Sequence, residues 1–452
     1  MRKTIEQSKG DDTRLSIHTS SLFDSKRKCF LSNVCIVVDG ETGLIVDTHT
    51  RQQPLPDHDV SDTSTIDLRG YTVLPGLVDS HTHIFLHPYS DTPSLHQMRD
   101  ESLVERVVRA TNHAKVALMA GYTTYRDLGT EGLRDADVSF RDTINRGLIP
   151  GPRMYVATEC IASSGGYEVR QENGLPGVGT SVPRISDPAD GPYGVRAAVR
   201  RRLGAGADIV KFYADYRKRR LRFPAAAWPG CREILFPPSN DLLDNEQNPN
   251  IVLFTQEEMD AMVAEARNSK APIAAHAASP EAVIMAAKAG VTSLEHGFVP
   301  GADALDAMKE HGTIFVPTLS VVESETRPGR GDEKVDRAFQ QILDHTKAAC
   351  DKGVKLAAGG DTGAFAHGDN ARELELMIKA GIPLVDTLQA ATLHGWEACG
   401  AELCGRRFGH LGKGWAADII ALHGDPRESI EALRKVAFVM KDARVYKHEK
   451  PA

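Results

Sequence analysis

The sequence predicts an α/β fold, a (β/α)8 TIM barrel with a small β domain attached. Short apolar segments, each followed by a helical pattern, recur eight times within residues 73–400 of the 452-residue chain. The apolarity of these segments is nearly continuous, which is typical of strands buried on both faces. An open doubly wound sheet would bury its strands in the same way, and the count of eight favours the barrel.

Each expected element has its own local signals. The strands are expected at residues 72–83, 123–129, 153–159, 207–214, 272–276, 291–296, 313–319 and 355–361. Thr255 and Glu258 form a capping box that opens a helix. Pro280 and Gly290 mark the start and the stop of the next helix. A long helix is also expected at 332–352, and helices follow at 371–380 and 384–398.

Both ends of the chain carry a different pattern. The segment "CIVVDGETGLIVD" is an apolar run, a DG turn signal and a second run, which together predict a β-hairpin. Similar runs recur near the C-terminus. We therefore expect one β-sandwich domain from residues 1–72 and 401–452, beside a barrel from residues 73–400. Two stretches without periodicity, 163–193 and 215–250, follow expected strands and should cover the C-terminal face of the barrel.

Composition excludes several classes of function. The net charge of −7 argues against nucleic-acid binding. No apolar run reaches the roughly 18 residues that a membrane span needs, and the first residues lack the apolar stretch of a secretory signal. Seven scattered cysteines without a CxxC pair suggest reduced thiols and a cytoplasmic protein. GxSxG, GxGxxG and P-loop motifs are absent from the sequence, so neither a serine hydrolase nor a nucleotide cofactor is implied.

Potential metal ligands fall at the ends of the expected strands. They are His81, His83, Lys211, His276, His296 and Asp361. In a barrel these ends converge on one rim. Residues two apart in a strand face the same side, so His81 and His83 can hold one cation, with Asp361 completing the set. Each residue alone has an ordinary explanation, as a core histidine, a surface lysine or a helix N-cap. Together they predict a metal site.

Lys211 points to two metals rather than one. It lies in the apolar segment "DIVKFYA", where an unpaired ammonium is costly. Two metals about 3.5–4 Å apart need a bridging anion. A lysine with a lowered pKa can take up CO₂, and the resulting carbamate would bridge as a carboxylate does.

The motifs "VDSHTHIF", "VKFYADY", "IAAHAAS", "SLEHGF" and "AAGGDTGAF" resemble the amidohydrolase superfamily, over residues 35–445. The chain is most similar to the imidazolonepropionase-like branch, with its Xaa-Pro dipeptidases (prolidases) and ochratoxinases. True imidazolonepropionases lack the bridging lysine and use one metal. The resemblance implies two divalent ions, Zn²⁺ above all, although Mn²⁺ and Fe²⁺ accept the same ligands. By this resemblance the buried metal binds His81, His83 and Asp361, the exposed metal binds His276 and His296, and N6-carboxylated Lys211 bridges them.

The resemblance also implies a mechanism, in which a metal-bridging hydroxide attacks an amide carbonyl while Asp361 acts as general base and then acid. Tyr213 faces the same side as Lys211, so its hydroxyl either contacts the substrate or bonds to a barrel neighbour. His367 is a candidate for substrate contact or for a supporting layer. Arginines at 217, 219, 220 and 222 could attract a carboxylate, although a charge run is usually a solvated face. Tyr167 stands where related enzymes carry the histidine of a Gly-Gly-His segment.

The expected activity is cleavage of a dipeptide, an N-acyl amino acid or a similar small amide, ochratoxin-like amides included. A mononuclear cyclic-amide hydrolase or deaminase on the same barrel is the alternative, and it would leave Lys211 idle. A non-catalytic metal-bearing scaffold is a third reading. The expected partner is a small-molecule amide or peptide, without nucleic acid or membrane, and a homo-oligomer is expected.

Overall fold

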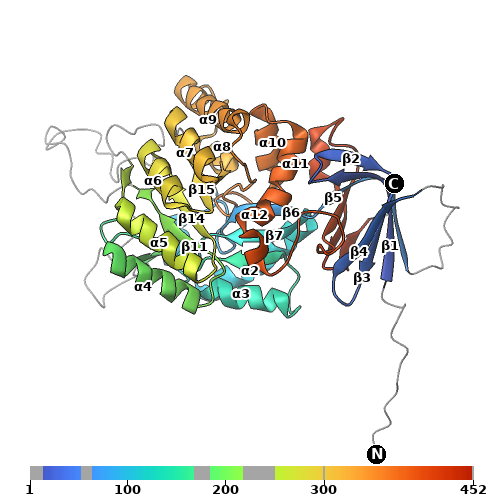
Figure 1. Ribbon diagram of the computed structural model, residues 1–452, viewed down its shortest axis with the longest axis horizontal. Coiled ribbons are helices and arrows are strands. Elements are labelled where there is room, and N and C mark those ends of the chain that lie inside the picture. Colours follow the sequence, from blue (N-terminus) through green and yellow to red (C-terminus); the bar gives the residue numbers. More distant parts are fainter. Residues whose placement is uncertain (1–13, 52–63, 167–183, 217–249, 299–300, 450–452) are drawn as a thin grey trace, which may run out of the picture.

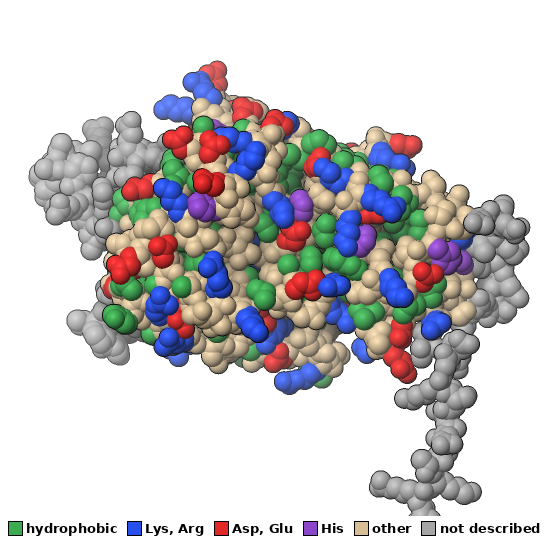
Figure 2. All heavy atoms as spheres, in the orientation of Figure 1, with side chains coloured by type: hydrophobic (Ala, Val, Ile, Leu, Met, Phe, Trp, Pro, Cys, Tyr) green, Lys and Arg blue, Asp and Glu red, His purple; other side chains and the backbone are tan. Residues whose placement is uncertain are grey.

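The computed structural model describes residues 14–51, 64–166, 184–216, 250–298 and 301–449. A larger α/β part and a smaller β part lie side by side (Figure 1). The larger part is TIM-barrel-like, with parallel strands inside and helices outside. On the face shown in Figure 2, acidic and basic side chains are interspersed. Among the described residues, no helix combines the length and apolarity that crossing a bilayer requires.

Parallel strands form the interior of the α/β part. One sheet contains β6 (Leu77–Thr82), β7 (Tyr122–Asp127) and β8 (Arg153–Val156). The other has the order β10-β9-β11-β14-β15-β16. Its strands are β9 (Cys160–Ala162), β10 (Ser186–Pro188), β11 (Val210–Tyr213), β14 (Ile273–Ala277), β15 (Ser293–His296) and β16 (Ile314–Val316).

Backbone hydrogen bonds also connect the two sheets. The amide of Asp208, two residues before β11, donates to Val156 O in β8 at 2.8 Å. At the other side, the amide of Ser80 in β6 donates to Ala358 O at 2.8 Å, and the amide of the adjacent Ala357 donates to Phe315 O in β16 at 3.0 Å. The expected eighth strand, 355–361, is present only as an isolated bridge between Phe315 and Leu356. The sequence there, "AAGGD", lacks the branched side chains that favour a regular strand. Complete closure of the barrel stays a prediction.

Helices form the outer layer (Figure 1). The expected ones are α2 (Leu103–Met119), α3 (Ala136–Asn145), α4 (Gly191–Gly204), α5 (Gln256–Asn268), α6 (Pro280–Ala289), α7 (Gly301–His311), α9 (Glu333–Lys352) and α10 (Ala371–Lys379). The capping box of Thr255 and Glu258 is confirmed. The helix expected at 384–398 is instead divided into α11 (Leu384–Ala390) and α12 (Leu393–Ala398), where the Thr392 hydroxyl donates to Leu388 O at 2.6 Å.

Two helices were not expected from the sequence. They are α1 (Ser94–Asp100) and α8 (Leu319–Thr326). The strand expected at 313–319 ends at Val316, and α8 begins after Thr318, whose φ is 51°. The carboxylate of Glu373, in α10, accepts hydrogen bonds from the amides of Leu319 and Ser320 at 3.0 and 2.8 Å. A residue more than 50 positions away therefore satisfies the first turn of α8.

The β part combines both ends of the chain. It contains β1 (Arg14–Asp24), β2 (Cys29–Ser32), β3 (Val34–Asp39), β4 (Leu44–Thr50), β5 (Thr65–Pro75), β17 (Ile419–Leu422), β18 (Val436–Lys441) and β19 (Arg444–His448). The predicted hairpin is the β3–β4 pair, and β5 pairs with β17. The sequence predicted a sandwich, but hydrogen bonds connect all eight strands as one sheet. The domain boundaries at 72/73 and 400/401 stay predictions.

A buried ion-pair cluster joins the two parts. Arg153, the first residue of β8, contacts Asp418 at 2.6 Å and Asp442 at 2.8 Å. The side chain of Asp418 is only 1% exposed, so it has almost no access to water. An uncompensated charge in that position is costly.

We predict that Arg153→Ala lowers the free energy of unfolding by about 3–5 kcal/mol, because Asp418 loses its partner. Urea denaturation followed by circular dichroism would measure this. Arg444→Ala, at an exposed position of β19, is the matched control and should change stability by less than about 0.5 kcal/mol. Equal stability of the two variants would contradict the prediction.

Candidate metal-binding active site

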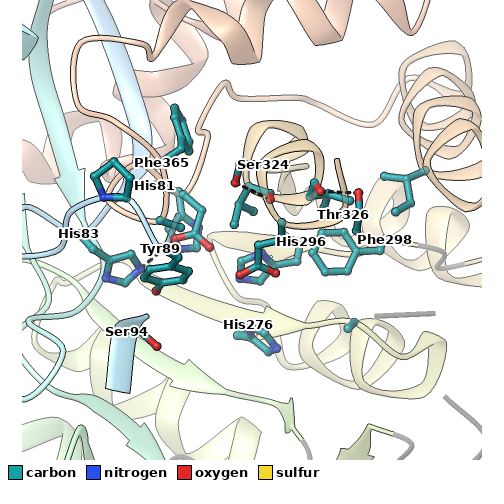
Figure 3. A pocket seen from close by; sticks show the side chains of 18 of the residues that line it. His81, His83, Tyr89, Ser94, His276, His296, Phe298, Ser324, Thr326 and Phe365 are labelled. Carbon is teal, nitrogen blue, oxygen red and sulfur yellow. Dashed lines mark hydrogen bonds and ion pairs between the residues drawn. The ribbon is translucent and has the colours of Figure 1, made fainter. Parts of the chain in front are cut away.

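The six predicted ligands line one cavity, of about 1620 Å³, at the C-terminal ends of the strands. His81 is in β6, Lys211 in β11, and His276 and His296 are in β14 and β15. His83 and Asp361 follow strand-like segments. Figure 3 shows the four imidazoles around this cavity. Residues from opposite ends of the sequence thus meet because parallel strands end on one side.

The tightest group consists of His81, His83 and Asp361, whose potential ligand atoms all lie within 4.8 Å of one another. Asp361 Oδ1 is 3.6 Å from His81 Nε2 and 3.1 Å from His83 Nε2. His276 and His296 adjoin this group. Their ring centroids are 4.5 Å apart, and that of His296 is 5.0 Å from that of His81.

Three of the four imidazoles have a partner on the nitrogen that faces away from this group. His81 Nδ1 is 3.0 Å from Glu295 Oε2, and His83 Nδ1 is 2.8 Å from Gly129 O. His296 Nδ1 is 2.9 Å from Thr318 Oγ1. These contacts leave Nε2 of all three rings free as a ligand atom. Metal-binding histidines typically donate from their other nitrogen in this way.

His276 has the opposite orientation. Its Nε2 is 3.7 Å from Asp215 Oδ1, which is longer than a hydrogen bond, and has no hydrogen-bond partner among the described residues. Nδ1 is then the nitrogen available to a ligand. Asp215 itself accepts hydrogen bonds from the amides of Ala278 and Ser279, so its carboxylate is firmly placed.

Lys211 is the clearest sign that the site takes a further group. Its side chain is buried, and within the described part of the chain its Nζ has no hydrogen-bond partner. Burial lowers the pKa of this amine, which favours the neutral, nucleophilic form. An amine of this kind, beside four imidazoles and a carboxylate, fits a bridging carbamate and two divalent cations.

Burial also sets the charge of the imidazoles. It lowers the pKa of His81 to about 4 and holds the pKa values of His276 and His296 well below the usual range. These rings are therefore neutral at pH 7, the form that binds metals. For His83, burial is outweighed by Asp361, and the pKa rises to about 9. Burial would raise the pKa of Asp361, but His81 and His83 outweigh it and keep that carboxyl ionised.

A buried ion pair supports His81 from below. Glu295 accepts from Arg126 Nη2 at 2.8 Å and from the Ser293 hydroxyl at 2.6 Å, besides its contact with His81. The side chains of Arg126 and Glu295 are fully buried. Burial would raise the pKa of Glu295, but Arg126 and His81 outweigh it and lower the pKa to about 2. The carboxylate thus stays charged and fixes the orientation of His81.

Local backbone strain marks the same rim. His296, Thr318 and Asp361 have φ values of 77°, 51° and 62°, in the left-handed region that costs these residue types about 1 kcal/mol or more. A Cβ at Gly359 would lie 2.6 Å from the backbone nitrogen of His81. Glycine at this position therefore allows the segment that carries Asp361 to approach β6 closely.

Of the two candidates for substrate contact, one lines the cavity and the other does not. Tyr213 lines the cavity, with its ring centroid 5.3 Å from that of His276. His367 is not among the residues that line it. Its Nε2 is 3.1 Å from Leu86 O, and its ring stacks on His113 at 4.3 Å. This position fits the supporting layer, and a substrate contact by His367 stays a prediction without geometric support. Tyr167 and the arginines at 217–222 lie outside the described residues.

Several residues of the site were not found from the sequence. They are Tyr89, Glu131, Tyr216, Glu295 and Phe298. A charged residue inside the apolar segment "TSLEH" was a usable signal for Glu295, but its partner His81 is 214 positions away. The others lie on segments without periodicity, or in the two-residue strand β12 (Asp215–Tyr216), which pairs with β13 (Ile251–Val252).

We predict that Glu295→Gln weakens Zn²⁺ binding about 10- to 100-fold, because His81 loses its charged partner. Competition with a chromophoric chelator would measure the affinity. Glu281→Gln, at an exposed position in α6, is the matched control. A thermal melt of each metal-free protein separates loss of affinity from loss of stability. Unchanged Zn²⁺ affinity in a folded Glu295→Gln protein would refute this role.

Comparison with known proteins agrees with this geometry. The profile of the amidohydrolase family matches residues 72–447. Ochratoxinase from Aspergillus niger is 28% identical over an alignment of 403 residues, and the match covers 83% of this chain and 75% of that protein. Its crystal structure has a TM-score of 0.75 at 25% identity, with 96% of each chain covered.

A second solved structure is a Xaa-Pro dipeptidase with methionine bound in its active site. It is 32% identical, has a TM-score of 0.75 and covers 96% of this chain and 100% of its own. These matches confirm the expected resemblance and the TIM-barrel-like α/β fold with a second domain. They also confirm the expected class of enzyme, a hydrolase of carbon–nitrogen amide bonds. The chain belongs to the amidohydrolase family.

Proposed function

We propose that this protein is a binuclear metal-dependent amidohydrolase that cleaves a dipeptide, an N-acyl amino acid or a similar small amide. The observation that carries the proposal is the buried Lys211 Nζ without a hydrogen-bond partner among the described residues, in a cavity with five further ligand residues. A mononuclear site would give this amine no task. The similarity to ochratoxinase and to a Xaa-Pro dipeptidase supports the choice of amide substrate.

The ligand residues divide into two groups. His81, His83 and Asp361 would hold one cation, and His276 and His296 the other, with carboxylated Lys211 between them. Divalent ions bound there, Zn²⁺ above all, would lower the pKa of a water molecule and polarise the amide carbonyl. The neutral imidazoles of His81, His276 and His296 and the ionised Asp361 are in the protonation states that such binding needs, whereas His83 would have to release a proton to the cation.

The chain's own groups would then move the proton. Asp361 keeps partial access to the cavity, with 17% of its side chain exposed. Its carboxylate would take a proton from the attacking water and pass it to the leaving nitrogen. Oδ1 lies 3.1 Å from His83 Nε2, so both atoms could bind the same cation. The Tyr213 hydroxyl, on the same side of β11 as Lys211, would donate to the carbonyl oxygen or to a substrate carboxylate.

We predict that Lys211→Ala loses at least one of two bound metals and lowers kcat/KM on N-acyl amino acids about 100-fold or more. Elemental analysis would give the metals per chain, and short carboxylic acids should restore part of the activity by replacing the carbamate. Lys288→Ala, at an exposed position of α6, is the control. One metal in the wild-type protein, with full activity in Lys211→Ala, would instead favour the mononuclear alternative.

We predict that Asp361→Asn lowers kcat by a factor of about 10²–10⁴, because the amide cannot take the proton. The KM should change far less than kcat, since the carboxamide keeps the size of the carboxylate. Metal content has to be measured for the same sample, because Asp361 is also a ligand candidate. A variant that retains its metals and also its kcat would show that another group transfers the proton.

The location and the assembly stay expectations. We propose a cytoplasmic protein that forms a homo-oligomer and acts on small molecules rather than on nucleic acid or membranes. Scattered cysteines support the location, and the net charge of −7 argues against nucleic acid.

A further inference from the structure

The cavity extends well beyond the ligand cluster. Its volume of about 1620 Å³ exceeds the roughly 300–1000 Å³ of ordinary small-molecule sites. In Figure 3 the imidazole of His83 lies toward one side, while Phe298 and Thr326 lie on the other, beyond His296. The cavity therefore has room for a large group next to the position where an amide would react.

Helices α8 and α9 give this extension an apolar wall. The wall residues are Val321, Val322, Val335, Ala338, Phe339 and Ile342, with Phe298 nearby. Four of them, Val321, Val322, Phe339 and Ile342, belong to the main hydrophobic core. Since these side chains are packed from behind, the wall is a fixed surface. It favours a substrate group that is flat or bulky and apolar.

Two hydroxyl groups in the wall do not make it polar. Ser324 Oγ donates to Val321 O at 2.9 Å, and Thr326 Oγ1 donates to Val322 O at 2.7 Å. Figure 3 shows both hydrogen bonds. The donors are thus used within α8, and a polar uncharged substrate group would gain little here.

Two guanidinium groups follow the wall. Arg327 and Arg330 lie in the connection from α8 to α9, line the same cavity and are exposed. Within the described part of the chain, neither side chain has a hydrogen bond or an ion pair. Four acidic residues line the same cavity. Asp361 contacts the histidines, Glu131 Oε1 lies 3.8 Å from His83 Nδ1, and Asp91 accepts from the Ser90 hydroxyl. Glu325 lies two positions before Arg327 and has an interaction of its own. The two positive charges are thus available to an anionic group that passes the wall.

We propose, on the basis of the amide hydrolysis proposed above, that this cavity selects amides with a bulky aromatic flank that ends in an anionic substituent. The reacting amide lies at the ligand cluster, the aromatic group lies along α8 and α9, and the anion meets Arg327 and Arg330. These two arginines and Ala338 are then specificity-determining residues. No group of the substrate beyond the amide takes part in the bond cleavage.

Two series of substrates test this selection in the metal-loaded protein. One series carries acetyl, 2-naphthoyl or 6-carboxy-2-naphthoyl on phenylalanine. The other consists of acetyl amides of phenylalanine, 2-naphthylamine and 6-amino-2-naphthoic acid. The wall lies on one side of the reacting amide, so only the series that places the naphthalene ring on that side should respond. In that series, kcat/KM should rise about tenfold or more with the ring and several-fold again with its carboxylate. The second increase should shrink at high salt, because Arg327 and Arg330 are exposed.

Variants with matched controls locate the effect. Ala338→Trp fills the extension and should reduce the preference for naphthalene about tenfold, whereas Ala348→Trp, exposed on the same helix and outside the lining, should retain it. The double variant Arg327→Gln/Arg330→Gln should lose the preference for the carboxylate. Arg337→Gln, exposed on α9 and outside the lining, should keep it.

Binding without turnover separates the two proposals. Naphthalene-2,6-dicarboxylate should bind about tenfold more tightly than benzoate, and the double variant should abolish most of the difference. Hydrolysis of acetylphenylalanine with no preference in either series would overturn the selection and leave the amidohydrolase proposal intact. Absence of all turnover would overturn the proposed function, and the selectivity of binding would then decide the inference alone. Equal binding of the two anions would overturn it.

Discussion

The buried ion pair between Arg126 and Glu295 is the interaction on which the site depends. It joins β7 to β15, and through His81 it also reaches β6, so three strands share one polar contact inside the barrel-like core. Two fully buried charges tolerate no loss of a partner, since either one alone would remain unsolvated. The pair therefore fixes the relative position of these strands. It also leaves His81 Nε2 directed at Asp361, which is what a metal ligand requires.

Around this pair, several residues adopt strained backbone angles that let neighbouring segments approach closely. His296, Thr318 and Asp361 adopt left-handed backbone angles, and Gly359 lies against the backbone of His81. Such strain persists only where surrounding packing determines the conformation. Here the supporting contacts are backbone hydrogen bonds, such as that of Ser80 with Ala358, and the large apolar core outside the strands. Packing of that core thus offsets the unfavourable backbone angles of the ligand residues.

The features that could be predicted from the sequence are those that a short segment carries by itself. The ligand residues end strands whose apolar runs are visible in the sequence, and Lys211 was notable as a charge within such a run. Contacts between distant segments were not accessible. Glu295 supports a histidine 214 positions away, and the first turn of α8 depends on Glu373. The same limitation affected His367, whose place is set by stacking on His113 rather than by its distance in sequence from Asp361.

The residues assigned to the reaction and those assigned to substrate selection therefore lie in different parts of the fold, but the two sets are connected. The ligands are fixed on strand ends, whereas α8 and α9 form the wall that we assign to the substrate flank. Thr318 connects the two, because its hydroxyl contacts His296 Nδ1 at 2.9 Å and its backbone directly precedes α8. A wall held in a fixed position relative to His296 through this residue would leave a poorly fitting substrate with its amide displaced from the ligands. Fit along the wall would then influence the reacting site itself, and selection would act on the rate as well as on binding.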